Sequence, residues 1–328
     1  MTSRVFNLAV VIVNYRTGGL TVEALRSLAD DLAGRADRCA VVVDNASGDG
    51  SAEVIENAIA EQRWQDWVRL IRAPANDGFS SGNNIGIRAV AADFYLLLNS
   101  DARVRPGAID RLLKAMENLP DAGLIGPRLE GEDGTPQDSS FRNLTPVTEL
   151  MASAATGPID RLLARHQISL GIQDYLLEAE WISFACVMIR HSMIEAIGPM
   201  DEDYFLYFED IDYCRRARAA GWKVFTDPSA RAVHLRGGTA SLKQAMRERR
   251  RLPRYHYASR ARYFAKFHGG HAGIVFANLL WMSGRAVSLI RQGIGNRTPQ
   301  TADRQGLDNW MFIVHPLRRF RPERGEVP

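Results

Sequence analysis

The feature that most constrains the fold is an unbroken apolar run near the N-terminus, from Leu8 to Val13, which ends in β-branched side chains. A short run of this kind is typical of a strand buried on both faces, as in a parallel sheet. Similar runs recur at residues 40–43, 68–71 and 94–98. Helical spacing separates these runs, so the first ~125 residues are predicted to form a doubly wound α/β sheet.

The remaining predicted elements are less sharply bounded. Apolar residues have helical spacing at 22–32, 51–59, 83–91, 108–116 and 213–220. Ser51 is expected as an N-cap, and Pro106 at the first position of a helix. Further strands are predicted at 182–189, 222–225 and 230–233. Residues 128–180 lose the alternation, which predicts a long functional loop.

Polar side chains follow three of the predicted strands directly. They are Asn14 and Tyr15, Asp44 and Asn45, and Asn99, Ser100 and Asp101. The carboxyl ends of parallel strands meet at one edge of a sheet, where such folds bind ligands, so we expect these side chains to converge. Each has an ordinary alternative: Asp and Asn are common turn residues, and Tyr15 could pack instead of stacking on a base.

No glycine-rich phosphate loop follows the first strand. Residues 16–19, Arg-Thr-Gly-Gly, fit neither the dinucleotide fingerprint nor the P-loop, which argues against a dehydrogenase or an ATPase and weakens a nucleotidyltransferase interpretation. The uncharged stretch from Asn76, broken only by Asp77, runs through Gly82 into a helix. Its free amide groups could face an anion, although a capped turn explains the pattern equally well.

Acidic residues cluster again late in the chain. Glu209 and Asp210 are adjacent and point to different sides, so one of them can receive a proton. Asp212 has arginines close by and is expected in an ion pair. Asp101 and His234 are candidate ligands of Mg²⁺ or Mn²⁺, although a lone histidine is more often structural.

Charge is distributed unevenly along the chain. Residues 1–235 contain 23 Lys/Arg and 33 Asp/Glu, whereas residues 236–328 contain 18 and 5. A basic C-terminal region predicts an anionic partner, either a membrane surface or a nucleic acid, and no RNA-binding module is recognisable. The stretch from Ile274 to Ile290 fits an amphipathic helix, which could lie in a membrane interface or pack on the preceding domain.

The sequence predicts neither a membrane-spanning protein nor a secreted one. No stretch reaches about 18 uncharged apolar residues, so no spanning helix is expected. No signal peptide precedes the first strand. The three cysteines have neither zinc nor disulfide spacing, which indicates a reducing cytosol.

Taken in order, five motifs resemble glycosyltransferase family 2, the inverting enzymes with the GT-A fold, and within it the bacterial rhamnosyltransferase-like branch. The motifs span residues 10–235. They are VVIVNYRTG (10–18), VVVDNASGDGS (41–51), NDGFSSGNNIGI (76–87), LLLNSDARVRPGA (96–108) and the segment 184–234.

The resemblance implies a role for each matching position. Nucleotide contacts are implied for Tyr15 and Asp44 at the base, together with Asn14, Asn45, Asn76, Gly82 and Asn99. Asp101 and His234 would bind Mn²⁺ or Mg²⁺, Asp210 would be the catalytic base beside Glu209, and Trp181 would contact the acceptor. Asn99 replaces the first acid of the metal motif, so Asp101 would bind the metal with less help. Residues 183–185 lack the glycine that is more usual in this branch.

These roles predict an inverting glycosyltransferase. Residues 1–238 would form the GT-A catalytic domain, with 128–180 on the acceptor side, and residues 239–328 a basic helical extension. The favoured donor is dTDP-rhamnose, with UDP- and GDP-sugars as alternatives. The acceptor would be a glycan or a polyprenyl-diphosphate-linked glycan of the cell surface, met at the inner face of the cytoplasmic membrane. No nucleic acid partner is expected. A non-catalytic nucleotide-sugar-binding relative and a membrane-associated adaptor remain alternatives.

Overall fold

The computed structural model describes residues 5–235, 245, 248–295 and 301–322, and the chain forms two compact units. Unit 1 consists of Met1–Phe141, Leu170–Glu202 and Asp210–Gly238. Unit 2 consists of Arg142–Ser169, Asp203–Glu209 and Thr239–Pro328. The sequence predicts one boundary, at residue 238. In the structure, two internal segments also belong to the same unit as the C-terminal residues.

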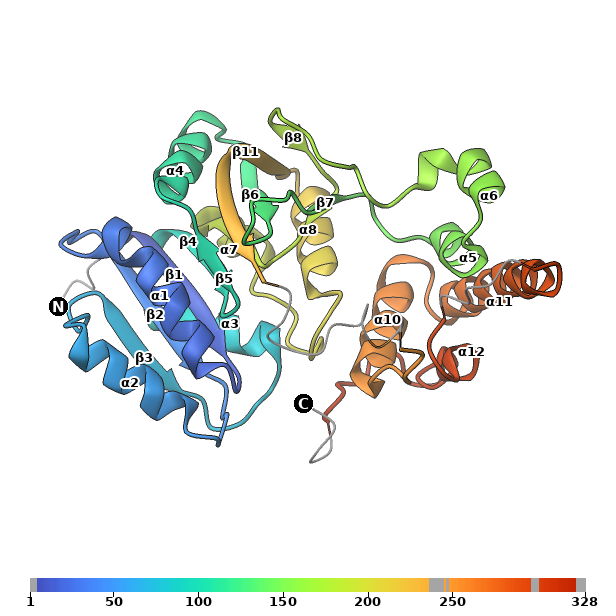
Figure 1. Ribbon diagram of the computed structural model, residues 1–328, viewed down its shortest axis with the longest axis horizontal. Helices are drawn as coiled ribbons and strands as arrows, with labels where there is room; N and C mark the ends of the chain where they lie inside the picture. Colours follow the sequence, from blue (N-terminus) through green and yellow to red (C-terminus); the bar gives the residue numbers. More distant parts are fainter. Residues whose placement is uncertain (1–4, 236–244, 246–247, 296–300, 323–328) are drawn as a thin grey trace. The chain divides into compact units, whose positions relative to one another are not determined.

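Unit 1 is built on a mixed sheet, which has nine strands among the described residues (Figure 1). The order is β3-β2-β1-β4-β10-β6-β11-β5, and β8 also pairs with β11. Strands β1 to β4 are mutually parallel, β10 runs antiparallel to β4 and β6, and β11 runs parallel to β6. The bounds are β1 Phe6–Asn14, β2 Arg38–Asp44, β3 Val68–Arg72, β4 Ala92–Asn99, β5 Ala102–Val104, β6 Ala122–Glu130, β8 Leu177–Glu178, β10 Cys186–Arg190 and β11 Lys223–His234.

Helices lie in the connections between these strands. Their bounds are α1 Gly18–Leu32, α2 Ser51–Glu61, α3 Phe79–Ala89, α4 Ala108–Asn118, α7 His191–Ile197 and α8 Glu209–Ala219. Strand β1 is buried on both faces: Leu8, Val10 and Ile12 join one apolar cluster, and Ala9 and Val11 join another. The prediction of a doubly covered sheet is confirmed.

Helix α3 approaches β1 unusually closely because two of its residues are glycines. A Cβ atom on Gly86 would lie 2.3 Å from Val11 Cγ1, and one on Gly82 would lie 2.8 Å from Val13 Cγ1. Both distances are shorter than real contacts between side chains. The glycines of this motif therefore let the helix pack against the strand.

Several predicted boundaries are wrong. The two strands predicted at 222–225 and 230–233 are one strand, β11, whose pairing with β6 shifts register between Asp227 and Arg231. The strand predicted at 182–189 is two: β9 (Trp181–Ile182) pairs with β7 (Ser140–Phe141) in a small second sheet, and β10 enters the main one. In β11, the register shift after Asp227 is a β-bulge, which lets this single strand continue through the turn-like Asp-Pro sequence.

The predicted helix starts also differ. Gly50 caps α2 in place of Ser51, and Gly107 caps α4, so Pro106 precedes the cap and does not take the first helical position. Helix α3 begins at Phe79, before the predicted start. Both capping glycines have left-handed φ angles, 89° and 75°, which glycine adopts without a Cβ penalty.

Unit 2 is helical. Its elements are α5 Pro146–Ala154, α6 Gly157–Leu162, the 3-10 helix η1 Ala164–His166, α10 Arg254–Phe267, α11 His271–Gly293 and α12 Gln305–Asp308. Helix α11 packs on α5 through Gly284, where a Cβ atom would lie 2.2 Å from Ser153 Oγ. Buried Arg260 joins this core by donating to Glu149 Oε2 at 2.8 Å.

Helix α11 also bears on the question of a membrane. By length and composition alone it could cross one, which differs from the prediction that no helix could. Within the described residues it is the one helix that meets these criteria, and 39% of its most apolar window is buried inside the protein. The core helix of a soluble protein satisfies the same criteria, so they do not establish a membrane span.

Candidate active site

The polar residues at the strand ends meet at one edge of the sheet, as the sequence predicts. Asn14 pairs in register with Asp44 across β1 and β2, and Val13 pairs with Asn99 across β1 and β4. Parallel pairing of three consecutive strand ends brings these side chains together although they are separated by up to 85 residues of chain. The edge is the usual ligand-binding edge of such a sheet.

Asp44 is held rigidly at this edge. The residue is 4% exposed, and its Oδ1 accepts hydrogen bonds from Asn14 Nδ2 at 2.7 Å and Ser47 Oγ at 2.5 Å. Its Oδ2 accepts one from the Ser47 backbone N–H at 3.2 Å. Oδ2 therefore retains acceptor capacity for a further donor.

The two asparagines of the nucleotide prediction make internal hydrogen bonds. Asn14 is fully buried, and its Oδ1 accepts from Thr21 Oγ1 at 2.9 Å. Asn45 donates to Asn76 Oδ1 at 2.8 Å and to the Gly78 carbonyl oxygen at 3.1 Å. The visible role of Asn14 is to position Asp44, and that of Asn45 is to tie the β2 turn to the start of α3. Direct contact of either with a nucleotide stays a prediction.

Ser47 and Arg16 are two residues of this edge that the sequence analysis did not single out. Ser47 bonds Asp44, and its Oγ also accepts from the Arg16 backbone N–H at 3.0 Å. Arg16 has a positive φ of 56° and places its guanidinium 5.0 Å from the ring centre of Tyr15. The positive φ of Arg16, a non-glycine residue beside the ligand-binding edge, is a local signal that could have marked it as a site residue, and it is visible only in the structure.

Asp101, just before β5, lies close to His234 at the end of β11. His234 Nε2 lies 3.6 Å from Asp101 Oδ1, and both side chains are mostly buried. The Leu235 backbone N–H donates to the Asp101 carbonyl oxygen at 3.0 Å, which fixes the two chain segments together. Nearby in sequence, Asn99 Oδ1 is buried without a hydrogen-bond partner. The structure thus brings together the two residues predicted as metal ligands.

A carboxylate and an imidazole suit Mn²⁺, and the amide oxygen of Asn99, two residues before Asp101 in the sequence, is buried without a hydrogen-bond partner and is of the kind that Mn²⁺ and Mg²⁺ accept. Within the part of the chain that the structure describes, no three His, Cys, Asp or Glu residues gather as a metal cluster. Two protein ligands, Asp101 and His234, would leave the other positions of such a metal to substrate phosphate or water.

Asp210 lies in the first turn of α8. Its Oδ1 accepts a hydrogen bond from the Ile211 backbone N–H at 2.8 Å. Burial nevertheless raises the pKa of Asp210 from 3.8 to about 7, because a carboxylate loses hydration there. A carboxyl group with a pKa near neutrality can accept a proton during turnover. The predicted ion pair one turn later is confirmed, with Arg216 Nε 2.8 Å from Asp212 Oδ1.

The backbone immediately before α8 is strained. Tyr207 and Phe208 have positive φ angles of 69° and 70°, a conformation costly for bulky residues. Within unit 2 both rings pack on α10: Tyr207 stacks on Tyr255 with centroids 6.2 Å apart, and Phe208 lies 5.7 Å from His256. Packing on α10 thus holds the residues that lead into Glu209, which is itself buried, in this conformation.

Comparison with known proteins decides the family. The model of glycosyl transferase family 2 matches residues 9–198. The N-acetylglucosaminyl-diphospho-decaprenol L-rhamnosyltransferase of Mycobacterium tuberculosis (strain CDC 1551 / Oshkosh) is 30% identical over 243 residues, which cover 69% of this chain and 75% of that protein.

The chain belongs to glycosyltransferase family 2. Another relative of this glycosyltransferase is the low-salt glycan biosynthesis hexosyltransferase Agl10 of Haloferax volcanii, 28% identical over 70% of this chain and 67% of that one. Among solved structures, the mannosyltransferase PcManGT from Pyrobaculum calidifontis, in complex with GDP-Man and Mn²⁺, superposes with a TM-score of 0.55. It is 17% identical, and the match covers 90% of this chain and 78% of that one, which establishes the GT-A fold.

Trp181, which the sequence analysis predicts to contact the acceptor, belongs to a stacked aromatic pair. Trp181 on β9 stacks on Phe141 of β7, with ring centroids 4.2 Å apart and planes inclined by 23°. The sequence analysis named Trp181 and missed Phe141, because the two pair only through the small sheet formed by β7 and β9. Stacked aromatic rings offer a flat apolar surface of the kind on which sugar rings can rest.

Proposed function

We propose that this glycosyltransferase transfers a sugar from a nucleotide diphosphate to an acceptor hydroxyl with inversion, using Asp210 as the base. The observation that carries the proposal is the pKa of Asp210, raised by burial to about 7 in the same unit as the polar strand edge and the Asp101–His234 pair. A base poised near neutral pH is what deprotonation of a hydroxyl requires.

The donor would bind at the strand edge of unit 1. Asp44 is already oriented by Asn14 and Ser47, and its Oδ2 would accept a hydrogen bond from a donor group of a base or ribose. Tyr15 would stack on the base, and the guanidinium of Arg16 beside it supplies positive charge close to the nucleotide. A preoriented carboxylate loses less conformational entropy on binding than a mobile one.

Asp101 and His234 would hold Mn²⁺ or Mg²⁺, with Asn99 as an added oxygen ligand. When bound, the divalent ion supplies charge that neutralises the departing diphosphate. The chain's own part is to fix Asp101, just before β5, and His234, at the end of β11, through the Leu235–Asp101 backbone hydrogen bond, so that little rearrangement is needed.

The chemical step is a single displacement. Asp210 takes the proton from the acceptor hydroxyl as the hydroxyl oxygen bonds to the anomeric carbon. The bond from that carbon to the diphosphate oxygen breaks, and its electron pair leaves with the nucleoside diphosphate. Because attack and departure occur on opposite faces, the anomeric configuration inverts without a covalent intermediate.

The proposed donor and acceptor are supported by the names of the relatives. Rhamnose from dTDP-rhamnose is the favoured donor, and a polyprenyl-diphosphate-linked glycan the favoured acceptor, since the relative of M. tuberculosis is named for both an L-rhamnosyl transfer and a diphospho-decaprenol acceptor. The enzyme would then act in cell-surface polysaccharide synthesis at the inner face of the cytoplasmic membrane. Residues 1–238 would perform catalysis, with Trp181 and Phe141 under the acceptor.

The test is nucleoside-diphosphate release from a panel of dTDP-, UDP- and GDP-sugars, with Mn²⁺ or Mg²⁺ and an extract of lipid-linked glycans. Wild type should release one diphosphate in a metal- and acceptor-dependent way. Asp210→Asn should keep donor binding and lose at least about 100-fold in rate, the usual contribution of a general base. Donor binding without release under any acceptor would identify a non-catalytic relative. Absence of donor binding would refute the proposal.

A further inference from the structure

Helix α11 has apolar residues on two faces, and only one of them is covered. Ile274, Ala277 and Trp281 are buried against the rest of unit 2. The opposite face carries large apolar side chains whose exposed fractions run from 49% to 81%. They are Phe276, Leu279, Met282, Leu289, Ile290 and, just past the helix end, Ile294.

The exposed face of α11 bears no acidic charge. The helix contains neither Asp nor Glu along its 23 residues. Its two arginines are half-buried and make polar contacts: Arg285 Nη1 with Ser288 Oγ at 3.2 Å, and Arg291 Nη1 with the Ala154 carbonyl oxygen at 3.1 Å. Exposed apolar side chains that gather along one face of a helix mark a candidate interaction surface.

Polar contacts on the covered face argue against a transmembrane orientation. Arg260 Nη1 donates to Asn278 Oδ1 at 2.8 Å, and Asn278 Nδ2 donates to the Asn309 carbonyl oxygen at 3.0 Å, both in buried surroundings. Inserting α11 across a bilayer would break these bonds and carry Asn278 and Arg285 into hydrocarbon, at a cost of several kcal/mol for each polar group. The helix is therefore built to stay packed on α5 while its other face meets a partner.

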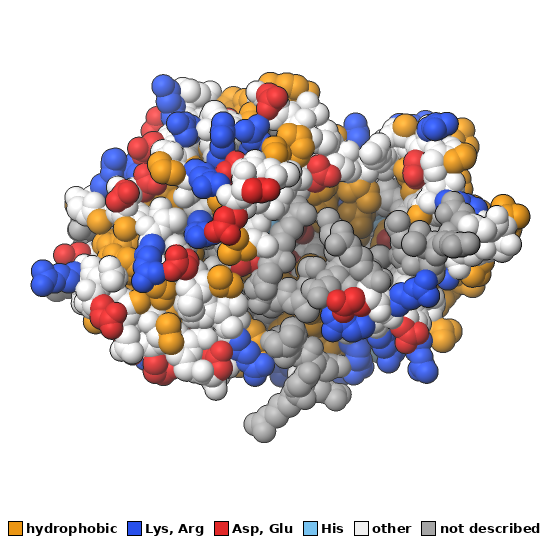
Figure 2. Space-filling model, viewed as in Figure 1, with side chains coloured by type: hydrophobic (Ala, Val, Ile, Leu, Met, Phe, Trp, Pro, Cys, Tyr) orange, Lys and Arg blue, Asp and Glu red, His pale blue; other side chains and the backbone are white. Residues whose placement is uncertain are grey.

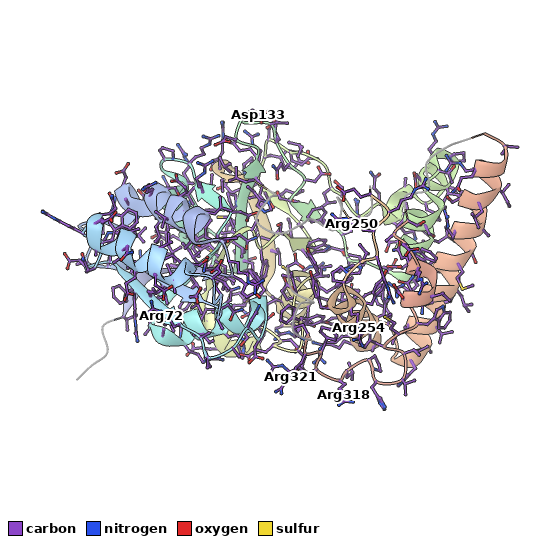
Figure 3. All side chains as sticks on the ribbon, turned by 60° about the horizontal axis from the view of Figure 1, so that its bottom comes forward. Arg72, Asp133, Arg250, Arg254, Arg318 and Arg321 are labelled. Atoms are coloured by element: carbon purple, nitrogen blue, oxygen red, sulfur yellow. The ribbon has the colours of Figure 1, made fainter. Side chains whose placement is uncertain are left out.

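The charge of the region indicates which partner. Residues 236–328 carry 18 basic and 5 acidic residues. Arg318 and Arg321 lie at the edge of unit 2 (Figure 3), and Figure 2 shows Lys and Arg side chains among hydrophobic ones where Figure 1 places α11. An exposed apolar helix face in a strongly basic part of the chain matches an anionic lipid surface, where acyl chains contact the apolar residues and headgroups contact the arginines.

We propose that α11 lies in the plane of an anionic lipid bilayer, with Leu279, Met282 and Leu289 at the boundary between headgroups and acyl chains. This inference rests on the proposed function for its purpose, since it names the surface through which the enzyme would reach a lipid-linked acceptor. The helix is at once packed on the protein and bound to the membrane.

Vesicle flotation of the full chain tests this. Wild type should float with vesicles of phosphatidylglycerol and phosphatidylcholine, and much less with phosphatidylcholine alone. Leu279→Asp and Leu289→Asp should each reduce the vesicle partition coefficient by at least about tenfold, because each places a carboxylate in the acyl boundary. Val54→Asp is the matched control: Val54 is 48% exposed on α2 of unit 1, against 50% for Leu279, and should float like wild type.

Three outcomes would overturn the inference. The first is equal flotation of wild type and both α11 variants. The second is wild type that resists extraction from vesicles by alkaline carbonate, which would mean that the helix spans the bilayer. The third is a lipid-free dimer of wild type that Leu279→Asp makes monomeric, which would show that a second copy covers the face. Donor binding is measured on the same proteins without lipid. Its absence would refute the proposed function and leave the flotation result standing.

Discussion

Asp210→Asn should remove catalysis and at the same time stabilise the folded protein at alkaline pH. The pKa of Asp210 is raised from 3.8 to about 7 by burial, so the folded state is more stable when this carboxyl group is protonated than when it is ionised. The contribution of the protonated carboxyl group to stability is fully present below pH 4 and is lost by the time the pH has risen through 7. Asparagine has nearly the same shape and stays neutral at every pH, so it escapes the loss.

The size of the effect follows from the shift. A difference of about 3 pKa units at about 1.4 kcal/mol per unit gives an upper limit of about 4 kcal/mol at pH 8 and close to zero at pH 4. Rearrangement around the ionised group and water entry will reduce this value. A gain of 1–3 kcal/mol corresponds to several degrees in the melting temperature of a domain of this size.

Thermal unfolding between pH 4 and pH 8 measures the gain, and diphosphate release measures the loss. The melting temperature of Asp210→Asn should rise above that of wild type progressively between pH 4 and pH 7, and the difference should stay constant above pH 7. Wild-type turnover should rise over the same interval, since the ionised form is the base. Asp93→Asn removes an exposed carboxyl group at the other end of β4 and serves as control. Equal melting curves for wild type and Asp210→Asn at pH 8 would refute the argument from burial.

Three further substitutions test other parts of the site. Asp101→Asn should shift the metal dependence of diphosphate release to at least about tenfold higher Mn²⁺ while donor binding without metal persists, and an unchanged metal titration would exclude Asp101 as a ligand. Asp44→Ala leaves buried donors unpaired, so it should lower stability by about 1–3 kcal/mol and weaken donor binding, as seen by denaturant unfolding and calorimetry. Gly86→Ala places a Cβ atom 2.3 Å from Val11 Cγ1 and should cost about 1–3 kcal/mol, whereas Gly19→Ala, which meets nothing within 4 Å, should be neutral in the same unfolding assay.

Much of the candidate site could be read from the sequence because its parts are local. Asp44 and Asn99 each follow a run of strand residues, and parallel pairing brings the ends of such runs together. The ion pair of Asp212 with Arg216 is one helical turn long and needs no tertiary information. What the pattern could not show is orientation: Asn14 looks like a ligand contact in sequence, but in the structure its amide is buried and bonded to Asp44 and Thr21.

The sequence by itself determined the alternating strands and helices, the order of the motifs and the family, because periodicity and residue type act over a few neighbouring positions. Only the tertiary structure decided that β10 enters between β4 and β6, and that residues 142–169 join the C-terminal unit. It also decided that Asp210 has a pKa of about 7, and that one apolar face of α11 is buried while the other is exposed. Strand order, burial and proton affinity depend on contacts between residues far apart in the chain, and no local pattern records them.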